Sequence, residues 1–230
     1  MKTIGLIGGM SWESSLEYYR LINEATKLRL GGLHSARCVL YSVDFAEIEE
    51  LQRSGRWPEA AQALAGAAQS VEAAGADFLV MCTNTMHRVA EEVERAVGIP
   101  LLHIADATAA VIRAAGVTTV GLLGTRYTME QEFYRGRLVE QHRLRVITPD
   151  EPDCTTVHDV IYQELVLGRI YAESKEAYRR IIDELISKGA EGVILGCTEI
   201  GLLVTQDDVP IPVFDTTRIH AEQAVGSALT

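Results

Sequence analysis

The sequence repeats one nine-residue stretch, first as GADFLVMCT (residues 75–83) and again as GAEGVILGC (residues 189–197). The copies align without a gap, 114 residues apart, and this alignment places Cys197 opposite Thr83. Matching Cys82 with Cys197 instead requires a shift of one residue inside an apolar run. In a buried strand, such a shift turns every side chain to the opposite face of the sheet. We therefore expect the two copies to end on different groups, a hydroxyl and a thiol.

The duplication extends along the whole chain. TIGLIG (residues 3–8) recurs as TVGLLG (residues 119–124), and IPLLH (residues 99–103) recurs as IPVFD (residues 211–215). Short apolar runs without alternation are typical of strands covered by helices on both faces. Because these runs alternate with helical patterns, we expect parallel sheets with right-handed crossovers. The sequence therefore predicts an α/β fold of two parallel-sheet domains, related by an approximate two-fold axis.

The apolar runs and the helical patterns give the expected boundaries. Strands are expected at residues 3–8, 37–43, 78–82, 100–104, 118–124, 144–148, 192–197 and 211–214. Helices are expected at residues 14–30, 59–74, 86–97, 129–142, 173–188 and 216–229. We place the first domain at residues 1–98 together with the C-terminal helix, about 214–230, and the second at residues 99–213.

Charge and composition exclude several classes of partner. The net charge is −11, from 21 basic and 32 acidic residues, whereas nucleic acids and anionic membranes reward clustered Lys and Arg. No apolar run reaches the length of a membrane span, and the N-terminus enters a strand directly, without the apolar core of a signal peptide. We therefore expect a soluble cytoplasmic protein whose four cysteines are reduced thiols.

Polar residues gather where the expected strands end. They form the segments GGMS (residues 8–11), TNT (residues 83–85), TRY (residues 125–127) and CTE (residues 197–199). In open parallel sheets, ligands bind beyond the carboxyl ends of the strands. If the two domains face each other, these loops converge on one cleft, which is our candidate site.

Other motifs point to less specific chemistry. The glycines at residues 5–9 lack the G-x-G-x-x-G spacing of a dinucleotide site, although the turn could hold a carboxylate. Cys154 and His158 lie four residues apart, but no second pair supports a zinc site. His87 either packs against the helix that it begins or takes part in chemistry. Cys197 ends a strand just before an expected helix, where backbone N–H groups and the helix dipole can lower a thiol pKa from about 8.5.

Three motifs and the duplication closely resemble the aspartate/glutamate racemase family, the cofactor-independent amino-acid racemases. The motifs are GGM (residues 8–10), NTMH (residues 84–87) and GCTE (residues 196–199), and the resemblance covers essentially the whole chain. It implies two α/β domains with the active site between them, a homodimer, and no cofactor such as pyridoxal phosphate. It also implies two cysteines on opposite faces of the substrate α-carbon, one taking the α-proton and the other delivering a proton.

The sequence departs from this family at the first cysteine, because the family pattern Cys-Asn-Thr-x-His is here Thr83-Asn84-Thr85-Met86-His87. We therefore predict that Cys197 is the principal base and that Thr83 occupies the opposing position, with Cys82 as the alternative to Thr83. Thr83, Asn84, Thr85 and Thr198 are expected to hold the α-carboxylate, and Ser11 and Glu199 the ammonium group. The full set of expected substrate-binding residues is Met10, Ser11, Gln52, Asn84, Thr85, Thr125, Thr198 and Glu199.

The resemblance also bears on the substrate side chain. Relatives that act on acidic amino acids hold the distal carboxylate with cationic side chains, but the matching loops here read AEI (residues 46–48) and LVL (residues 165–167). Gln52, Arg53 and Arg126 are the nearest substitutes, so neutral or broad substrates are expected besides aspartate and glutamate. The alternatives are a hydantoin racemase, maleate isomerase or malonate decarboxylase on the same scaffold, or a small-molecule-binding relative without turnover.

Overall fold

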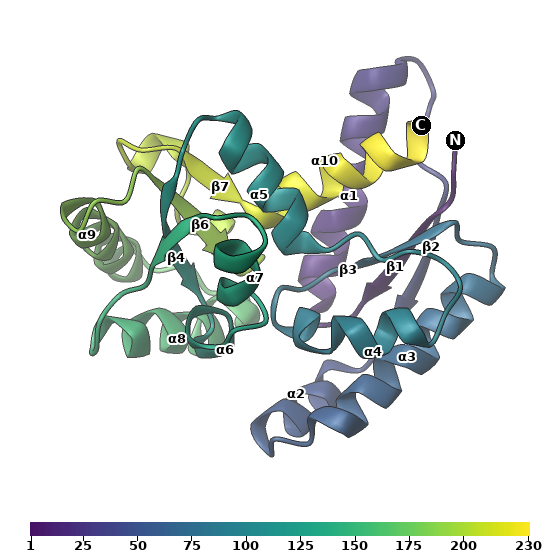
Figure 1. Cartoon of the computed structure of the whole chain (residues 1–230), viewed down its shortest axis with the longest axis horizontal. Coiled ribbons are helices and arrows are strands. Elements are labelled where there is room, and N and C mark those ends of the chain that lie inside the picture. Colours follow the sequence, from purple (N-terminus) through teal and green to yellow (C-terminus); the bar gives the residue numbers. More distant parts are fainter. The chain divides into compact units, whose positions relative to one another are not determined.

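Two parallel sheets organise the protein, each in its own unit of the chain. The structure, a computed structural model, describes residues 1–230. The first unit comprises residues 1–104 and 220–230, and the second comprises residues 105–219 (Figure 1). The chain thus crosses from the first unit to the second after residue 104 and returns at residue 220, and both crossings lie about six residues later than the sequence suggested. Residues 99–104 stay with the first unit, where Leu101 forms a parallel bridge with Leu79.

The first unit has a three-stranded sheet in the order β2-β1-β3, with all strands parallel. Its strands are β1 (Ile4–Gly8), β2 (Cys38–Ser42) and β3 (Phe78–Met81). Its helices are α1 (Trp12–Leu30), α2 (Phe45–Arg53), α3 (Trp57–Ala73), α4 (Ala90–Arg95) and most of α10 (Thr216–Leu229), and the 3₁₀ turn η1 (Thr85–Val89) precedes α4. One core cluster joins Ile7 and Leu79 to α3 and α4, and another joins Ile4 and Leu6 to α1 and α10. Helices therefore cover both faces, as the apolar runs predicted.

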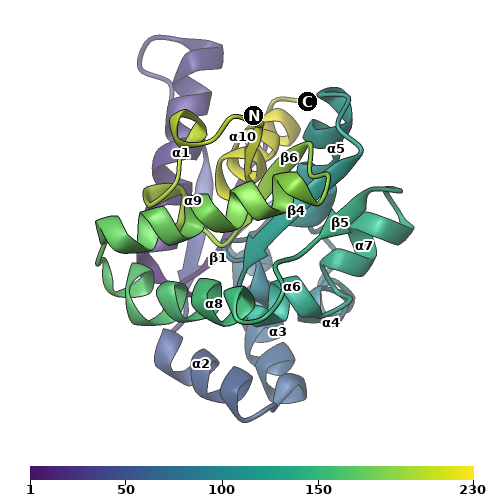
Figure 2. The same cartoon turned by 90° about the vertical axis from the view of Figure 1, so that its left-hand side faces the viewer.

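The second unit has a four-stranded parallel sheet in the order β5-β4-β6-β7. Its strands are β4 (Thr119–Gly124), β5 (Arg145–Ile147), β6 (Gly192–Gly196) and β7 (Val213–Asp215). Its helices are α5 (Ile104–Ala114), α6 (Arg126–Glu130), α7 (Arg135–Glu140), α8 (Asp153–Gln163) and α9 (Ala172–Ser187), and its 3₁₀ turns are η2 (Leu165–Leu167), η3 (Ile200–Leu202) and η4 (Gln206–Asp208). Helices α8 and α9 contact each other and β4 (Figure 2). No helix of the protein combines the length and the apolar character needed to cross a bilayer.

The predicted α/β class is confirmed, and most strand bounds agree within two residues, but two elements were predicted wrongly. Residues 100–104 form only the single bridge at Leu101, because α5 already begins at Ile104. The helix expected at residues 129–142 is interrupted. Gln131 adopts an extended backbone after α6, and the turn that follows buries Tyr134 completely before α7 begins.

The duplicated stretch has the same register in both sheets. In the first unit β1 pairs with β3, with Ile4 opposite Phe78, and in the second unit β4 pairs with β6, with Val120 opposite Gly192. Ile4 and Val120 are equivalent residues of the repeat, and so are Phe78 and Gly192. Counting outward from these pairs, Cys82 corresponds to Gly196, and Thr83 corresponds to Cys197. The strand pairing therefore agrees with the gap-free alignment and not with the alignment that matches the two cysteines.

Hydrogen bonds at the other end of the duplicated strands repeat in the same way. The carboxylate of Asp77 accepts from the backbone N–H of Thr3 at 2.6 Å, and that of Glu191 accepts from the N–H of Thr119 at 2.9 Å. Asp77 and Glu191 are equivalent residues of the repeat, as are Thr3 and Thr119. The same local interactions therefore fix the start of the duplicated strand in both units.

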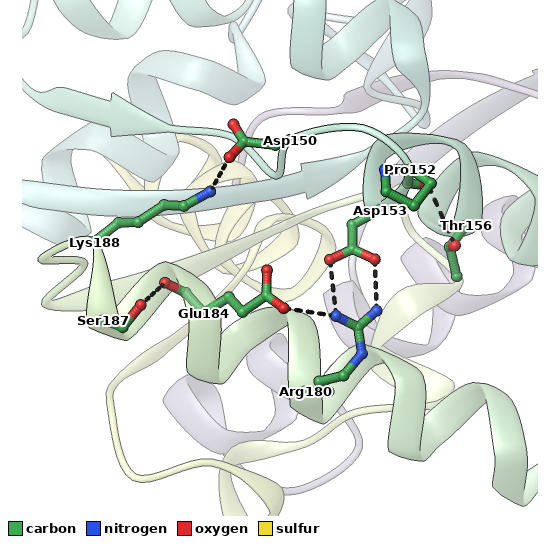
Figure 3. A network of polar contacts seen from close by, with 8 residues as sticks. All are labelled: Asp150, Pro152, Asp153, Thr156, Arg180, Glu184, Ser187 and Lys188. Atoms are coloured by element: carbon green, nitrogen blue, oxygen red, sulfur yellow. Dashed lines mark hydrogen bonds and ion pairs between the residues drawn. The ribbon is translucent and has the colours of Figure 1, made fainter.

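A polar network joins α8 to α9 (Figure 3). Arg180 of α9 donates to both carboxylate oxygens of Asp153, at 2.5 and 3.0 Å, and also to Glu184 at 2.7 Å. Hydrogen bonding from Arg180 holds the pKa of Asp153 below its usual value. Because Arg180 is half exposed, solvent screens its ion pair with Asp153. We therefore expect the pair to orient α8 against α9 and to contribute little to the free energy of unfolding.

Candidate active site

The turn after β1 is tight and satisfies its own polar groups. Gly9 has a φ of +93°, and a Cβ there would lie 2.2 Å from the carbonyl oxygen of Val43, so only glycine fits. Its N–H donates to Ser15 Oγ at 2.7 Å, and Ser11 Oγ accepts from the N–H of Ser14 as the N-cap of α1. We predicted that this turn could bind a carboxylate, but the Gly9 N–H is not available to a ligand because it already donates to Ser15. Met10 is buried in the core cluster with Ile7.

Cys82 and Thr83 have different surroundings at the end of β3. Cys82 is completely buried in the core between the sheet, α1 and α10, and this burial raises the pKa of its thiol. Its carbonyl oxygen accepts from Ser14 Oγ at 2.8 Å. Thr83 and Asn84 follow in the loop between β3 and η1, Thr85 begins η1, and all three residues are buried. Cys82 is thus a core residue just beyond β3, and Thr83 follows it in the loop.

His87 fastens this loop. Its Nδ1 lies 2.8 Å from the carbonyl oxygen of Thr83, and its Nε2 accepts from the N–H of Ile104 at 3.2 Å. The side chain is only 2 % exposed. Because backbone groups occupy both ring nitrogens, the packing interpretation of His87 describes the structure better than direct chemistry.

Gln52 and Arg53, the two residues of the first unit suggested to hold a substrate side chain, have different surroundings. Gln52 is buried, and its Nε2 lies 2.9 Å from Sδ of Met86, which follows Thr85 in η1. Arg53 is 67 % exposed and forms an ion pair with Glu50 on the same helix. The structure therefore places the neutral Gln52 against η1, whereas the charge of Arg53 is directed to the surface.

In the second unit, Cys197, Thr198 and Glu199 follow β6. Sγ of the half-buried Cys197 donates to Oε2 of Glu199 at 3.0 Å, and Thr198 Oγ1 donates to the same oxygen at 2.5 Å. Glu199 is only 4 % exposed. A buried carboxylate therefore lies within hydrogen-bond reach of the thiol, as a general base requires.

The pKa of the Cys197 thiol corrects a prediction. We expected backbone N–H groups and a helix dipole to lower it, but burial, followed by the charge and hydrogen bond of Glu199, raises it well above its usual value. The backbone N–H groups of Thr198 and Glu199 act in the expected direction but are outweighed. The following helix is only the three-residue turn η3, so its dipole is short. The resting residue is therefore a thiol that donates to a carboxylate.

Thr125 and Arg126 also serve local structure. Thr125 Oγ1 accepts from the N–H of Thr128 as the N-cap of α6. The guanidinium of Arg126 pairs with Glu130 at 2.7 Å and with Glu151 at 2.5 Å. Its positive charge is thus matched by two carboxylates of its own unit.

Cys154 and His158, weighed as metal ligands, both contact backbone groups on or beside α8. Cys154 Sγ donates to the carbonyl oxygen of Pro149 at 3.2 Å. Nδ1 of His158 accepts from the N–H of Arg126 at 3.3 Å. The structure contains no group of three or more His, Cys, Asp or Glu side chains arranged to hold a metal ion.

The comparison with known proteins decides the family. Residues 7–224 match the sequence family described as Asp/Glu/Hydantoin racemase. The chain belongs to this family. The resemblance drawn from the three motifs and the duplication is therefore confirmed, and the chain is an enzyme of the isomerase class.

Individual relatives of this racemase-family enzyme agree. The broad-specificity amino-acid racemase RacX of Bacillus subtilis strain 168 is 26% identical over 171 residues, which cover 74% of this chain and 73% of that protein. A crystal structure of a Yersinia pestis protein classed as an Asp/Glu racemase is 59% identical over 100% of both chains, with a TM-score of 0.94. An aspartate racemase homologue from Pyrococcus horikoshii OT3 is 36% identical over 100% of both chains, with a TM-score of 0.88.

Tyr178 and His220 are buried polar residues that the sequence did not single out. Tyr178 Oη donates to the carbonyl oxygen of Val157 at 3.0 Å, and burial, with a smaller contribution from Cys197, raises its pKa. His220 lies on α10, with Nδ1 2.8 Å from Tyr18 Oη and Nε2 2.8 Å from the carbonyl oxygen of Leu102. Both residues fall on buried faces of expected helices, where an apolar pattern tolerates a single Tyr or His. The pattern therefore carried no signal for either.

Replacing Glu199 with glutamine should make Cys197 more reactive toward iodoacetamide. The substitution removes the negative charge that raises the thiol pKa, so more thiolate exists at any pH below that pKa. The thiolate fraction should rise roughly tenfold for each unit by which the pKa falls, and because a less basic thiolate is a weaker nucleophile, alkylation should accelerate by roughly threefold per unit. The measurement is the rate of carbamidomethylation of the Cys197 peptide at pH 8 by mass spectrometry. The Cys154 peptide of the same digest serves as the internal reference, and an unchanged or slower rate at Cys197 would contradict the assignment.

Acid should destabilise the protein through His220. Burial lowers the pKa of this ring to about 4, whereas the unfolded chain binds the proton near 6.5. Its contribution to stability is therefore lost as pH falls from about 6.5 to about 4, with about 2 kcal/mol gone between pH 7 and pH 5. Urea unfolding at these two pH values should show this loss in the wild type but not in His220→Asn. A ring that titrates near 6.5 in an NMR experiment on the native protein would overturn the prediction.

Proposed function

We propose that this enzyme racemises amino acids without a cofactor, by exchange of the α-proton between Cys197 and Thr83. One observation carries the proposal, namely the shared register of the duplicated strands, which makes Thr83 and Cys197 equivalent residues of two equivalent units. Inversion by deprotonation needs two acid/base groups on opposite faces of the α-carbon. A duplicated unit can contribute one group to each face.

The proposed proton path begins at Cys197. Its thiol passes a proton to Glu199, whose carboxylate oxygen lies 3.0 Å from Sγ, and the resulting thiolate removes the substrate α-proton. The hydroxyl of Thr83 then delivers a proton to the opposite face of the carbanion. Exchange with solvent returns a proton to Thr83 and resets the Cys197–Glu199 pair. The enzyme ends the cycle unchanged, and the substrate is inverted at the α-carbon.

The reaction also needs hydrogen-bond donors that stabilise the transition state, and residues next to Thr83 and Cys197 can supply them. The carbanion-like transition state places negative charge on the α-carboxylate, and donors aimed at that charge stabilise it. Asn84, Thr85 and Thr198 follow the strand ends next to Thr83 and Cys197. Because a hydroxyl is a much weaker acid than a thiol, we expect the two directions of the reaction to have unequal rates.

The substrates extend beyond aspartate and glutamate in this proposal. Gln52 supplies a neutral amide against η1, and the charges of Arg53 and Arg126 are matched by carboxylates of their own units. An amide binds neutral and acidic side chains with less discrimination than a cation. The name of the RacX relative, a broad-specificity racemase, supports the same view.

Incubation with single L- and D-amino acids in deuterated water tests the proposal. We expect solvent deuterium at the α-position together with appearance of the opposite enantiomer. Chiral separation of the products, starting from the L- and from the D-amino acid, measures the reaction in both directions. Binding of amino acids without any α-deuterium would contradict a racemase and favour a ligand-binding relative. Turnover of a hydantoin, maleate or a malonate, with no exchange in amino acids, would instead favour another chemistry of the same family.

A further inference from the structure

Three histidines of the first unit form a buried cluster where the chain crosses between the units. His87, His103 and His220 are at most 7 % exposed. The ring centroid of His87 lies 4.6 Å from that of His103 and 5.8 Å from that of His220. The proposed chemistry uses none of these rings, although Nδ1 of His87 lies 2.8 Å from the carbonyl oxygen of Thr83.

The hydrogen bonds of His87 assign its tautomer. The carbonyl oxygen of Thr83 can only accept, so Nδ1 carries the hydrogen and donates to it. The N–H of Ile104 can only donate, so Nε2 is unprotonated and accepts from it. One neutral ring therefore links the backbone of Thr83 to the backbone of Ile104, 17 residues further along the chain.

His220 makes the corresponding link at the second crossing. Its Nε2 donates to the carbonyl oxygen of Leu102, and its Nδ1 accepts from the hydroxyl of Tyr18. Ile104 is the last residue before the second unit, and His220 is the first residue after it. Both crossings are thus anchored within one cluster of rings, and the Thr83 carbonyl is bound to that cluster.

We propose that His87 is a positioning residue of the proton-transfer site, which holds Thr83 in place by binding its carbonyl oxygen to the Ile104 crossing. The proposal rests on the proposed function, in which the Thr83 hydroxyl protonates one face of the substrate. A hydroxyl that must reach a carbanion tolerates little displacement, since misplacement by about 1 Å can cost on the order of 10²-fold in rate. The ring itself contacts backbone on both sides and acts only through Thr83.

Two amide variants separate the two bonds of the ring. In His87→Asn, the amide nitrogen takes the place of Nδ1, which keeps the donor to Thr83 and loses the acceptor for Ile104. In His87→Gln, the amide oxygen takes the place of Nε2, which keeps the acceptor for Ile104 and loses the donor to Thr83. The two variants have similar volume and polarity, so each serves as the control for the other.

The readout is the ratio of deuterium exchange to inversion. When Thr83 is displaced, Cys197 can still remove the α-proton and return a deuteron to the same face, so exchange continues while inversion fails. We expect His87→Gln to lose inversion by about tenfold to a hundredfold while most exchange persists. We expect the ratio in His87→Asn to stay near that of the wild type. Equal loss of exchange and inversion in His87→Gln, or the same ratio in both variants, would show a merely structural role and overturn the proposal.

Two further measurements do not depend on turnover. Amide hydrogen exchange at Ile104 should accelerate in His87→Asn and stay slow in His87→Gln, and the opposite pattern would overturn the proposed link. Side-chain nitrogen NMR of the wild type should show His87 as the neutral Nδ1–H tautomer, and an Nε2–H tautomer would overturn it even if neither variant folds. If the wild type exchanges no amino acid while both measurements agree, the proposed function has failed and the link between Thr83 and Ile104 stands.

Discussion

Replacing Cys197 with serine should abolish measurable racemisation in both directions, a loss on the order of 10³-fold or more. General acid–base groups typically contribute 10²- to 10⁴-fold, and a serine hydroxyl is far too weak an acid for Glu199 to deprotonate at neutral pH. The substitution changes one atom and keeps the hydrogen bond to Glu199, so the loop should retain its conformation. Chiral separation of products from L- and D-substrates measures the loss, and exchange of solvent deuterium should disappear with it.

Cys154→Ser is the matched control for this substitution. Cys154 is buried and donates to the carbonyl oxygen of Pro149, a bond that a serine hydroxyl can also make. This variant should racemise at the wild-type rate. Substantial activity in Cys197→Ser would remove Cys197 from the proton path, whereas an equal loss in Cys154→Ser would show that any thiol replacement disturbs the fold.

The chemistry at Cys197 shows where sequence patterns suffice and where they do not. The thiol, its place at a strand end and its equivalence to Thr83 all follow from a nine-residue repeat, because a shift of one residue would turn every side chain of the strand to the opposite face of the sheet. The direction of the thiol pKa does not follow from it. That direction depends first on the burial of the thiol and then on the charge and hydrogen bond of the Glu199 carboxylate, both of which are set by tertiary packing.

The same limit explains the missed elements of the fold. The helix expected at residues 129–142 has an apolar pattern of helical period, but the backbone becomes extended at Gln131, and the turn before α7 buries Tyr134 completely. His87 was recognised from its motif, yet its bond to Ile104 joins residues that no local pattern connects. Periodicity therefore predicts which residues face a core, and contacts between distant segments decide the geometry of the candidate site.

Replacing Thr83 with alanine should lower inversion by roughly 10²-fold or more, while Cys82→Ala should leave racemisation largely intact. Thr83→Ala removes the hydroxyl that we propose protonates one face, but Cys197 keeps its partner Glu199, so α-deuterium exchange without inversion should persist. Cys82 is a fully buried core residue, so its truncation should lower the free energy of unfolding by about 1 kcal/mol without touching the proton path. Thr83→Ser, which keeps the hydroxyl, is the control that should retain inversion.

This comparison is decisive because the two alignments of the repeat predict opposite results. If the repeat is read in the register of the observed strand pairs, Thr83 is the counterpart of Cys197. If the cysteines were the true counterparts, Cys82→Ala would be inactive and Thr83→Ala active, and Cys82 would have to leave the core between α1 and α10 to reach a substrate. The proposed site thus pairs a thiol that can pass its proton to Glu199 with the hydroxyl of Thr83, a much weaker acid, and the rates in the two directions should differ for that reason.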